Sequence, residues 1–389
     1  MLKLQKNPNI DDPIENLYIH VPFCHKKCGY CDYYSIVSQT ADYESFLEAI
    51  KKEWKITKNY LEKNHNPLRP LKTLYFGGGT PSVLSPQILT QLINYFESEI
   101  GFASDIEITM EVNPEPIGQE TVLAGIKTGV NRISLGFQAK QDHLLKKIGR
   151  LHSYQDFLRM LDLIREQGIK NISCDLMFGL PDQNIEEALI SAQTLIDLQI
   201  PHISFYSLIL EENTLFYKKY AKHPELLPSE DSEREMYRQL LNIFESNQYQ
   251  YYELSSVAKD NYFSRHNYNY WSTKPYLGLG PGAHSYFNGI RKGNIRSIKD
   301  WALDPWKSAE IEEIDFDLAM REYAMLAFRL NEGFSVEKFE KRFLIKNPFE
   351  KELKNLIEQG LIVKDQQFEQ YYLNPKGLDF ANLVFMEFL

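Results

Sequence analysis

The chain has 389 residues, of which 43% are hydrophobic and 13% aromatic, a composition that supports a large core and is typical of two folded domains. Its formal net charge is -10, and its lysines and arginines are scattered among acidic residues, which argues against a nucleic-acid-binding surface. No apolar run approaches the roughly 18 to 20 residues that a membrane span requires, and residues 1–17 lack the apolar stretch of a signal peptide, so we expect a cytoplasmic protein.

Residues 1–16 are polar and without periodicity, and we expect an N-terminal tail there. From residue 17 onward, short apolar or alternating runs are each followed by a longer amphipathic segment, a pattern typical of βα units and a parallel sheet. The expected strands lie near 17–22, 72–76, 106–112, 132–137, 172–178 and 202–208, and the expected helices near 42–63, 86–99, 118–128, 154–167 and 185–197. We therefore predict an α/β fold with a partial (β/α)6 TIM-like barrel over residues 17–227, and an open doubly wound sheet is the alternative.

Polar and apolar residues alternate along three of these strands. Because alternate residues of a strand share one face, we predict a polar lumenal face made of Glu107, Thr109, Glu111, Asn113, Arg132, Ser134, Gly136, Gln138, Ser173 and Asp175. The intervening apolar residues would face the helices, and Cys174 is expected among them as a small buried residue. A solvated sheet face is the alternative, but strands between crossover helices rarely have one.

The composition changes twice in the second half of the chain. Residues 228–294 are rich in aromatic and turn-forming residues, and we expect them to cover the barrel mouth. Residues 295–389 predict a small C-terminal α+β domain of winged-helix type, with an amphipathic helix that ends at Gly333 and a hairpin followed by a helix. Acidic residues outnumber basic ones there, so packing on the barrel or binding a protein is expected in place of DNA binding.

Three of the four cysteines form a CxxxCxxC motif, Cys24, Cys28 and Cys31, directly after the first predicted strand. Such clustering does not resemble a disulfide framework and indicates a metal site. Three thiolates can bind three irons of a 4Fe-4S cluster and leave the fourth iron open to a small molecule. A structural zinc site, with His20 or His25 as fourth ligand, is the alternative that the spacing leaves open.

The second predicted strand runs into a glycine-rich loop with the sequence GGGTPS, residues 77–82. Absent side chains let backbone amides approach a ligand closely there, although a glycine triplet alone is a weak signal. The loop lacks the lysine of a P-loop, so it does not indicate nucleoside triphosphate binding.

Together the two loops resemble the radical S-adenosylmethionine (SAM) superfamily, and specifically its coproporphyrinogen oxidase-like branch, the HemN/HemW group. The resemblance runs from about Leu17 to the C-terminus. It includes, in the family's order, YIHVPFCHKKCGYCDYYS, GGGTPS, ITMEVNP, GVNRISLGFQ, GRLH, DLMFGLP, HNYNYW and GLGPGAHS.

The resemblance implies that Cys24, Cys28 and Cys31 bind a 4Fe-4S cluster, and that SAM is bound by Tyr18, Tyr30, Gly78, Gly79, Thr80, Glu111, Gln138, Arg150 and Asp175. The guanidinium of Arg150 suits a carboxylate, and an exposed salt bridge is the alternative for this residue. The implied chemistry is one-electron cleavage of SAM to a 5'-deoxyadenosyl radical. No catalytic residue is assigned beyond these ligands.

Two features separate the members of the group. The oxidases carry a further cysteine two residues beyond the triad, where this chain has Tyr33, so its pattern resembles the haem chaperones of the HemW type. The HNYNYW segment implies haem binding by His266, Asn267, Tyr270 and Trp271, with His266 as axial ligand. A buried histidine with packed aromatic rings is the alternative, and His284 in GLGPGAHS is an alternative ligand.

We therefore expect a radical SAM protein that binds haem and inserts it into respiratory enzymes, and an oxygen-independent coproporphyrinogen III oxidase is the alternative. A third hypothesis, a haem-carrying interaction module without radical chemistry, conflicts with the intact cluster and SAM positions. The expected cofactors are the 4Fe-4S cluster, SAM and haem. The expected partners are a haem-accepting respiratory protein and an electron donor, without nucleic acid; peripheral membrane association through the acceptor and a homodimer stay open.

Overall fold

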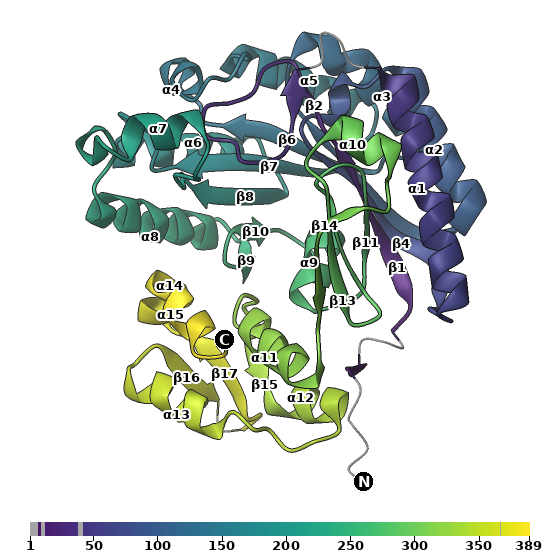
Figure 1. The fold of residues 1–389 in the computed structure, drawn as a ribbon. Coiled ribbons are helices and arrows are strands. Elements are labelled where there is room, and N and C mark those ends of the chain that lie inside the picture. The colour runs from purple at the N-terminus through teal and green to yellow at the C-terminus, as the bar shows by residue number, and fades with distance from the viewer. Residues whose placement is uncertain (1–6, 9–11, 38–41, 366) are drawn as a thin grey trace.

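The structure is a computed structural model that describes residues 7–8, 12–37, 42–365 and 367–389. Six strands form the centre of its largest sheet: β1 (Ile14–Val21), β4 (Leu68–Gly78), β5 (Phe102–Val112), β6 (Arg132–Gln138), β7 (Asn171–Phe178) and β8 (His202–Ser207). Each pairs in parallel with the next. The predicted partial (β/α)6 barrel is confirmed, and Figure 1 shows its curved sheet.

Helices cover the outer face of this sheet (Figure 1): α1 (Tyr43–Lys63), α2 (Pro86–Ile100), α3 (Gln119–Lys127), α4 (Asp142–Lys147), α5 (Tyr154–Glu166) and α6 (Ile185–Asp197). Local sequence explains their starts, because Ser153 and Asn184 form capping boxes that satisfy the first backbone N–H groups of α5 and α6. The apolar stripe of α5, which includes Phe157 and Leu161, is fully buried against the sheet. The main core therefore lies between helices and strands.

The N-terminal expectation needs a correction. Most of the tail expected over residues 1–16 lies outside the described residues, but β1 already begins at Ile14. Ile14 is 1% exposed and its backbone N–H donates to the carbonyl of Pro67, so the last three residues of the expected tail belong to the sheet.

The aromatic segment contributes to the barrel itself. Its elements are α8 (Glu230–Ser246), β9 (Gln250–Glu253), β10 (Ser256–Ala258), α9 (Arg265–Trp271) and β11 (Leu277–Leu279), and they follow the short helix α7 (Leu215–Tyr220). Strand β11 extends the sheet beside β1, and β10 and β9 extend it beyond β8. We did not predict these strands or α8, although Met236, Leu240 and Phe244 carry a helical spacing on its buried face.

The position of α9 differs from the expected cover over the barrel mouth. Its first residues bond to Thr73 and Glu107, which lie in the middle of β4 and β5 and are paired in the sheet. The mouth is formed by the carboxyl ends of those strands, at Gly78 and Val112. Helix α9 therefore closes the floor of the lumen.

A second sheet, β12 (His284–Phe287), β13 (Ile290–Asn294) and β14 (Ser308–Glu313), is antiparallel, and α10 (Ile298–Leu303) lies in the connection between its last two strands. The remaining elements form an α+β unit at one end of the barrel (Figure 1): α11 (Phe316–Ala327), β15 (Phe334–Ser335), α12 (Val336–Phe343), α13 (Glu350–Glu358), β16 (Ile362–Asp365), β17 (Gln370–Leu373), α14 (Pro375–Asp379) and α15 (Ala381–Met386).

This C-terminal unit has its own core, rich in phenylalanine. Helix α11 ends at Ala327, six residues before the Gly333 at which we expected it to end. Gly333 instead adopts a φ of +67° and turns the chain into β15, where the Cα hydrogen faces the carbonyl of Tyr371. The predicted hairpin is β16 and β17, with β15 as a third strand.

Candidate functional site

The cysteine loop begins where β1 ends. Two short parallel strands, β2 (Phe23–Cys24) and β3 (Ile36–Val37), bracket the loop, so that Cys24 is fixed in a strand while Cys28 and Cys31 lie on the connection. All four cysteines are free thiols. Burial, together with the neighbouring Cys28 and Cys24, raises the pKa of Cys31 to about 11. The three thiols thus form one group in which negative charges repel one another, which suits a strongly cationic occupant.

The glycine loop lies directly against the cysteine loop. The backbone N–H of Gly79 donates to Val21 O at 2.8 Å, and that of Thr80 donates to Phe23 O at 2.7 Å. A Cβ atom on Gly79 would lie 2.6 Å from Phe23 O, so only glycine allows the two loops to approach this closely. The Thr80 hydroxyl is 3.5 Å from the Cys24 sulfur, which completes the contact.

Polar side chains of the strands face a cavity of about 800 Å³ at the carboxyl ends of β4 to β8, a volume in the range of small-molecule and cofactor sites. Its lining includes all nine residues expected to bind SAM and the cysteine Cys31, together with His266, Asn267 and Tyr270 of α9. The predicted lumenal face is thus confirmed for Glu111, Gln138 and Asp175, while Cys174 is completely buried on the opposite face.

Two partly buried carboxyl groups, Glu111 and Asp175, lie close together in the lining of this cavity. Burial, together with the neighbouring Asp175 carboxylate, raises the pKa of Glu111 to about 7. Burial also raises the pKa of Asp175 to about 6. The Glu111 carboxylate accepts hydrogen bonds from the Tyr75 hydroxyl at 2.9 Å and from Gly78 N at 3.0 Å. The pair therefore favours a cationic ligand, which would offset the cost of ionising both groups.

The other predicted residues lie around these carboxyls. Arg150 donates to Asn113 Oδ1 at 2.7 Å and lies 3.9 Å from the Cys28 sulfur, so it is a buried cation beside the cysteine loop and not an exposed ion pair. Gln138, at the end of β6, has a φ of +64°, a conformation that non-glycine residues seldom adopt and that often marks functional sites. The Tyr18 hydroxyl contacts His20 Nδ1 at 3.1 Å, and the Tyr30 ring packs against Phe216.

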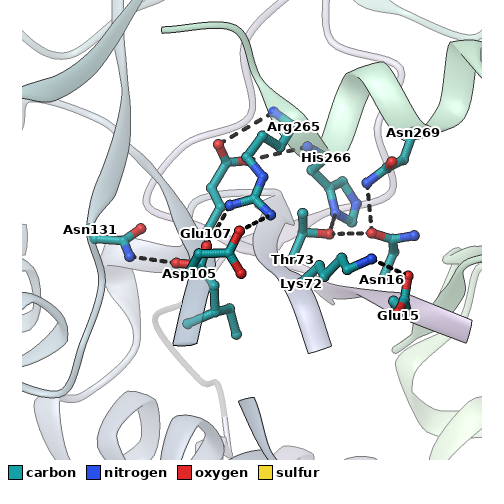
Figure 2. Close-up of polar contacts among 11 residues, drawn as sticks. Glu15, Asn16, Lys72, Thr73, Asp105, Glu107, Asn131, Arg265, His266 and Asn269 are labelled. Atoms are coloured by element: carbon teal, nitrogen blue, oxygen red, sulfur yellow. Dashed lines mark hydrogen bonds and ion pairs between the residues drawn. The ribbon is translucent and has the colours of Figure 1, made fainter. Parts of the chain in front are cut away.

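His266 is held at the cavity floor by a polar network (Figure 2). Its Nδ1 is 2.6 Å from the Thr73 hydroxyl. Its Nε2 is 2.6 Å from the Tyr270 hydroxyl. Glu107 accepts from the backbone N–H groups of Arg265 and His266, at 3.3 and 3.2 Å, at the start of α9 (Figure 2). Burial lowers the pKa of His266 to about 3, so the ring is neutral. Both ring nitrogens are engaged within the protein.

Trp271 is not brought to the cavity. Its ring lies under the guanidinium of Arg329, 4.0 Å from the ring centroid, and it is absent from the residues that line the described cavity. Asn267 and Tyr270 of the same helix do line it.

The two histidines weighed as fourth ligand of a zinc site differ in how many of their ring nitrogens are engaged. His20 is engaged through both ring nitrogens, with Tyr18 and with Tyr34 O at 2.8 Å. His25 pairs through Nδ1 with Glu115 at 2.7 Å, while its Nε2 has no partner among the described residues. Among the described residues, no three His, Cys, Asp or Glu side chains are arranged to hold a single metal ion.

Several tyrosines that we did not predict also line the cavity: Tyr33, Tyr34, Tyr75, Tyr206 and Tyr276. Two of them follow the alternation that identified Glu111, since Tyr75 precedes Gly77 by two residues on β4 and Tyr206 follows Ser204 by two on β8. That pattern was readable from the sequence. Together with Tyr18 and Tyr270 they give the cavity aromatic walls suited to a large planar ligand.

Comparisons with known proteins agree with this arrangement. Residues 18–195 match the radical SAM superfamily and residues 317–380 match the HemN C-terminal domain. The chain is 34% identical over 378 residues to the heme chaperone HemW of Lactococcus lactis, covering 96% of each chain. It is 35% identical over 383 residues to the heme chaperone HemW of Bacillus subtilis, covering 97% of this chain and 99% of that one.

Among solved structures, the coproporphyrinogen III oxidase HemN from Escherichia coli, described as a radical SAM enzyme, has the same fold, with a TM-score of 0.83 at 21% identity. The match covers 98% of this chain and 91% of that one. Within the described residues, no helix has the length and apolar character needed to cross a membrane. The chain therefore belongs to the coproporphyrinogen oxidase-like HemN/HemW group of the radical SAM superfamily.

Proposed function

We propose that Cys24, Cys28 and Cys31 bind three irons of the 4Fe-4S cluster that membership of the radical SAM superfamily implies. The donor set fits this group, because the three free cysteines of one loop can supply three thiolates and leave the fourth iron open. The nearby Arg150 supplies a further positive charge next to Cys28. When bound, the cluster supplies the electron that cleaves SAM.

SAM would lie along the carboxyl ends of the strands, in contact with Tyr18, Tyr30, Gly78, Gly79, Thr80, Glu111, Gln138, Arg150 and Asp175. The raised pKa values of Glu111 and Asp175 support this placement, because a sulfonium and an ammonium group would stabilise both ionised carboxylates. Arg150 would pair with the carboxylate of SAM, and its position in the cavity lining near the cysteine loop supports this role.

The function that the site supports best is binding haem and delivering it to respiratory enzymes. One observation carries the proposal: Tyr33, which stands where the oxidases of the group have a fourth cysteine, is 65% exposed and lines the cavity mouth. A phenol cannot replace a thiol there, whereas an exposed ring can contact a macrocycle. Similarity along nearly the whole chain to proteins named heme chaperone supports the same reading.

Haem would contact the aromatic wall of the cavity, including His266, Asn267 and Tyr270. Trp271 would support α9 from behind through its contact with Arg329. The further partners that we propose are a haem-accepting respiratory protein and an electron donor, in the cytoplasm. Contact with a membrane through the acceptor and a homodimer belong to the same proposal.

Anaerobic reconstitution followed by parallel assays tests this function. The reconstituted protein is expected to bind haemin, to transfer it to a haem-free acceptor, and to leave coproporphyrinogen III unchanged. Tyr33→Cys provides a matched variant, because it restores the pattern of the oxidases at one position. Decarboxylation of coproporphyrinogen by the wild-type protein at a rate above that of Cys24→Ala would overturn the proposal in favour of the oxidase.

A further inference from the structure

His284 lies opposite two particular residues in the second sheet. It begins β12 and pairs with Gly293 of β13, and Gly293 pairs in turn with Glu310 of β14. Directly paired residues of a sheet point to the same side, so the side chains of His284 and Glu310 flank a glycine on one face. Neighbouring strands are about 5 Å apart, which separates the outer two backbones by roughly 10 Å.

Gly293 allows the two outer side chains to meet over the middle strand. A Cβ atom there would lie 2.7 Å from Glu310 Oε1 and 3.1 Å from His284 Cε1. Because this space is free, the Glu310 carboxylate reaches across and lies 3.3 Å from His284 Nδ1. The contact fixes the imidazole with Nδ1 toward the carboxylate.

The other ring nitrogen, Nε2, has no hydrogen-bond or ion-pair partner among the described residues. The His284 side chain is 44% exposed and lines the same cavity as the cysteine and glycine loops. His266 differs in both respects, because it is 1% exposed and both of its nitrogens are engaged. An incoming iron could reach His284 without breaking any internal contact of that ring.

We propose that Nε2 of His284 is the axial ligand of the haem iron, an assignment that rests on the proposed haem-binding function. A histidine that binds a metal through one nitrogen commonly donates its other N–H to a carboxylate, which fixes the tautomer and raises the basicity of the ligand. Glu310 is the positioning residue with this role. Arg296, which lines the cavity and pairs with Asp32 at 3.6 Å, would exchange this contact for a propionate of haem.

Haemin titration of the full chain, followed by its Soret band and electron paramagnetic resonance spectrum, tests the ligand. His284→Ala is expected to lose the histidine-ligated spectrum and to bind haemin at least about tenfold more weakly. Removal of a residue that only hydrogen-bonds to a metal ligand already lowers metal affinity about 10- to 100-fold, and removal of the ligand itself should cost no less. The half-exposed position predicts an unchanged unfolding midpoint for this variant. His143→Gln is the matched control, because His143 is 61% exposed, pairs with Glu187 on the outer helices, and should leave the spectrum unchanged.

Two further variants probe the arrangement over the glycine. Glu310→Gln is expected to keep the histidine-ligated spectrum but to raise the midpoint potential of bound haem, because a less basic imidazole stabilises ferric iron less. Gly293→Ala should shift the potential in the same direction by pushing Glu310 away. A purely structural role of Glu310 would leave the potential unchanged, and that result would refute its positioning role.

The outcomes distinguish a wrong ligand assignment from a wrong proposed function. A wild-type spectrum in His284→Ala, or loss of the histidine-ligated spectrum in His266→Gln alone, would overturn the assignment while haem binding stands. Failure of the wild-type chain to bind haemin at all would refute the proposed function, and the assignment with it.

Discussion

Glu53 on α1 anchors the loop that leads into His284. It is completely buried, and its carboxylate accepts from Gly280 N at 2.8 Å, Trp301 Nε1 at 3.0 Å and Asn294 Nδ2 at 2.7 Å. Gly280 lies against the barrel so closely that a Cβ atom would be 2.5 Å from His20 O. One carboxylate therefore connects α1, α10, β13 and the loop at the cavity mouth.

Glu53→Ala removes the acceptor of two donors that have no other partner among the described residues, Gly280 N–H and Trp301 Nε1–H. Asn294 retains its bond to Gly280 O at 2.8 Å. Each buried unsatisfied donor costs about 1 to 3 kcal/mol, which gives about 2 to 6 kcal/mol for the pair. Relief of the desolvated carboxylate offsets part of this, and we expect a loss of about 3 kcal/mol in the free energy of unfolding.

Urea-induced unfolding of the apo-protein, followed by circular dichroism, measures this loss. Glu48→Ala is the matched control on the same helix, because Glu48 is 69% exposed and pairs only with Lys51, three residues on. The control should change stability by less than about 0.5 kcal/mol. If Glu53→Ala is as stable as the control, Glu53 does not anchor the loop and the reasoning fails.

The pH dependence of the stability difference between the wild type and Glu53→Ala is a second test. Burial raises the pKa of Glu53 to about 7, so the folded protein holds this proton more tightly than the unfolded chain does. The contribution of Glu53 to wild-type stability therefore falls as pH rises from about 5 to about 8, and the alanine variant lacks this fall. The stability difference between the two proteins should be larger at pH 5 than at pH 8, and the opposite trend would contradict the burial of the carboxyl group.

Three further variants test other parts of the molecule. Cys24→Ala should keep the unfolding midpoint and haem binding but lose SAM cleavage; production of 5'-deoxyadenosine equal to that of the wild type would refute the cluster assignment. Gly78→Ala should destabilise the protein by about 1 to 3 kcal/mol and weaken SAM binding, because φ is +105° and the new methyl group would run into the His20 ring. Gly101→Ala is the control, because Gly101 has a φ of +80° but an added Cβ atom would meet nothing within 4 Å. This variant therefore shows the cost of the backbone conformation alone, and an equal loss of stability in both variants would exclude the clash with His20. Phe339→Ala should cost about 3 to 5 kcal/mol in urea unfolding, since the ring is completely buried in the C-terminal core; a loss below about 1 kcal/mol would contradict that packing.

Much of the barrel could be predicted because its signals are local. Alternation along β5, β6 and β7 placed Glu111, Gln138 and Asp175 on one face, since side chains of a strand alternate whatever the rest of the chain does. The same rule would have found Tyr75 and Tyr206, and the spacing of Met236, Leu240 and Phe244 would have found α8.

The position of α9 could not be predicted in this way. Its seven residues depend on Thr73 and Glu107, which are 193 and 159 residues away from His266 in the chain. HNYNYW contains one of the two partners of its histidine, because Tyr270 follows His266 by four residues and contacts Nε2, but Thr73, the partner of Nδ1, comes from β4. The motif suggested a ligand at the mouth, and the packing made it part of the floor.

Sequence alone determined the parallel βα order, the lumenal carboxylates and the cysteine and glycine loops, because each depends on residues within a few positions of one another. Tertiary structure decided which histidine has a free nitrogen at the cavity. The contact between His284 and Glu310 exists because three strands align a histidine, a glycine and a carboxylate in one row. Such a row forms only when distant segments pair, and pairing register is a property of the folded sheet.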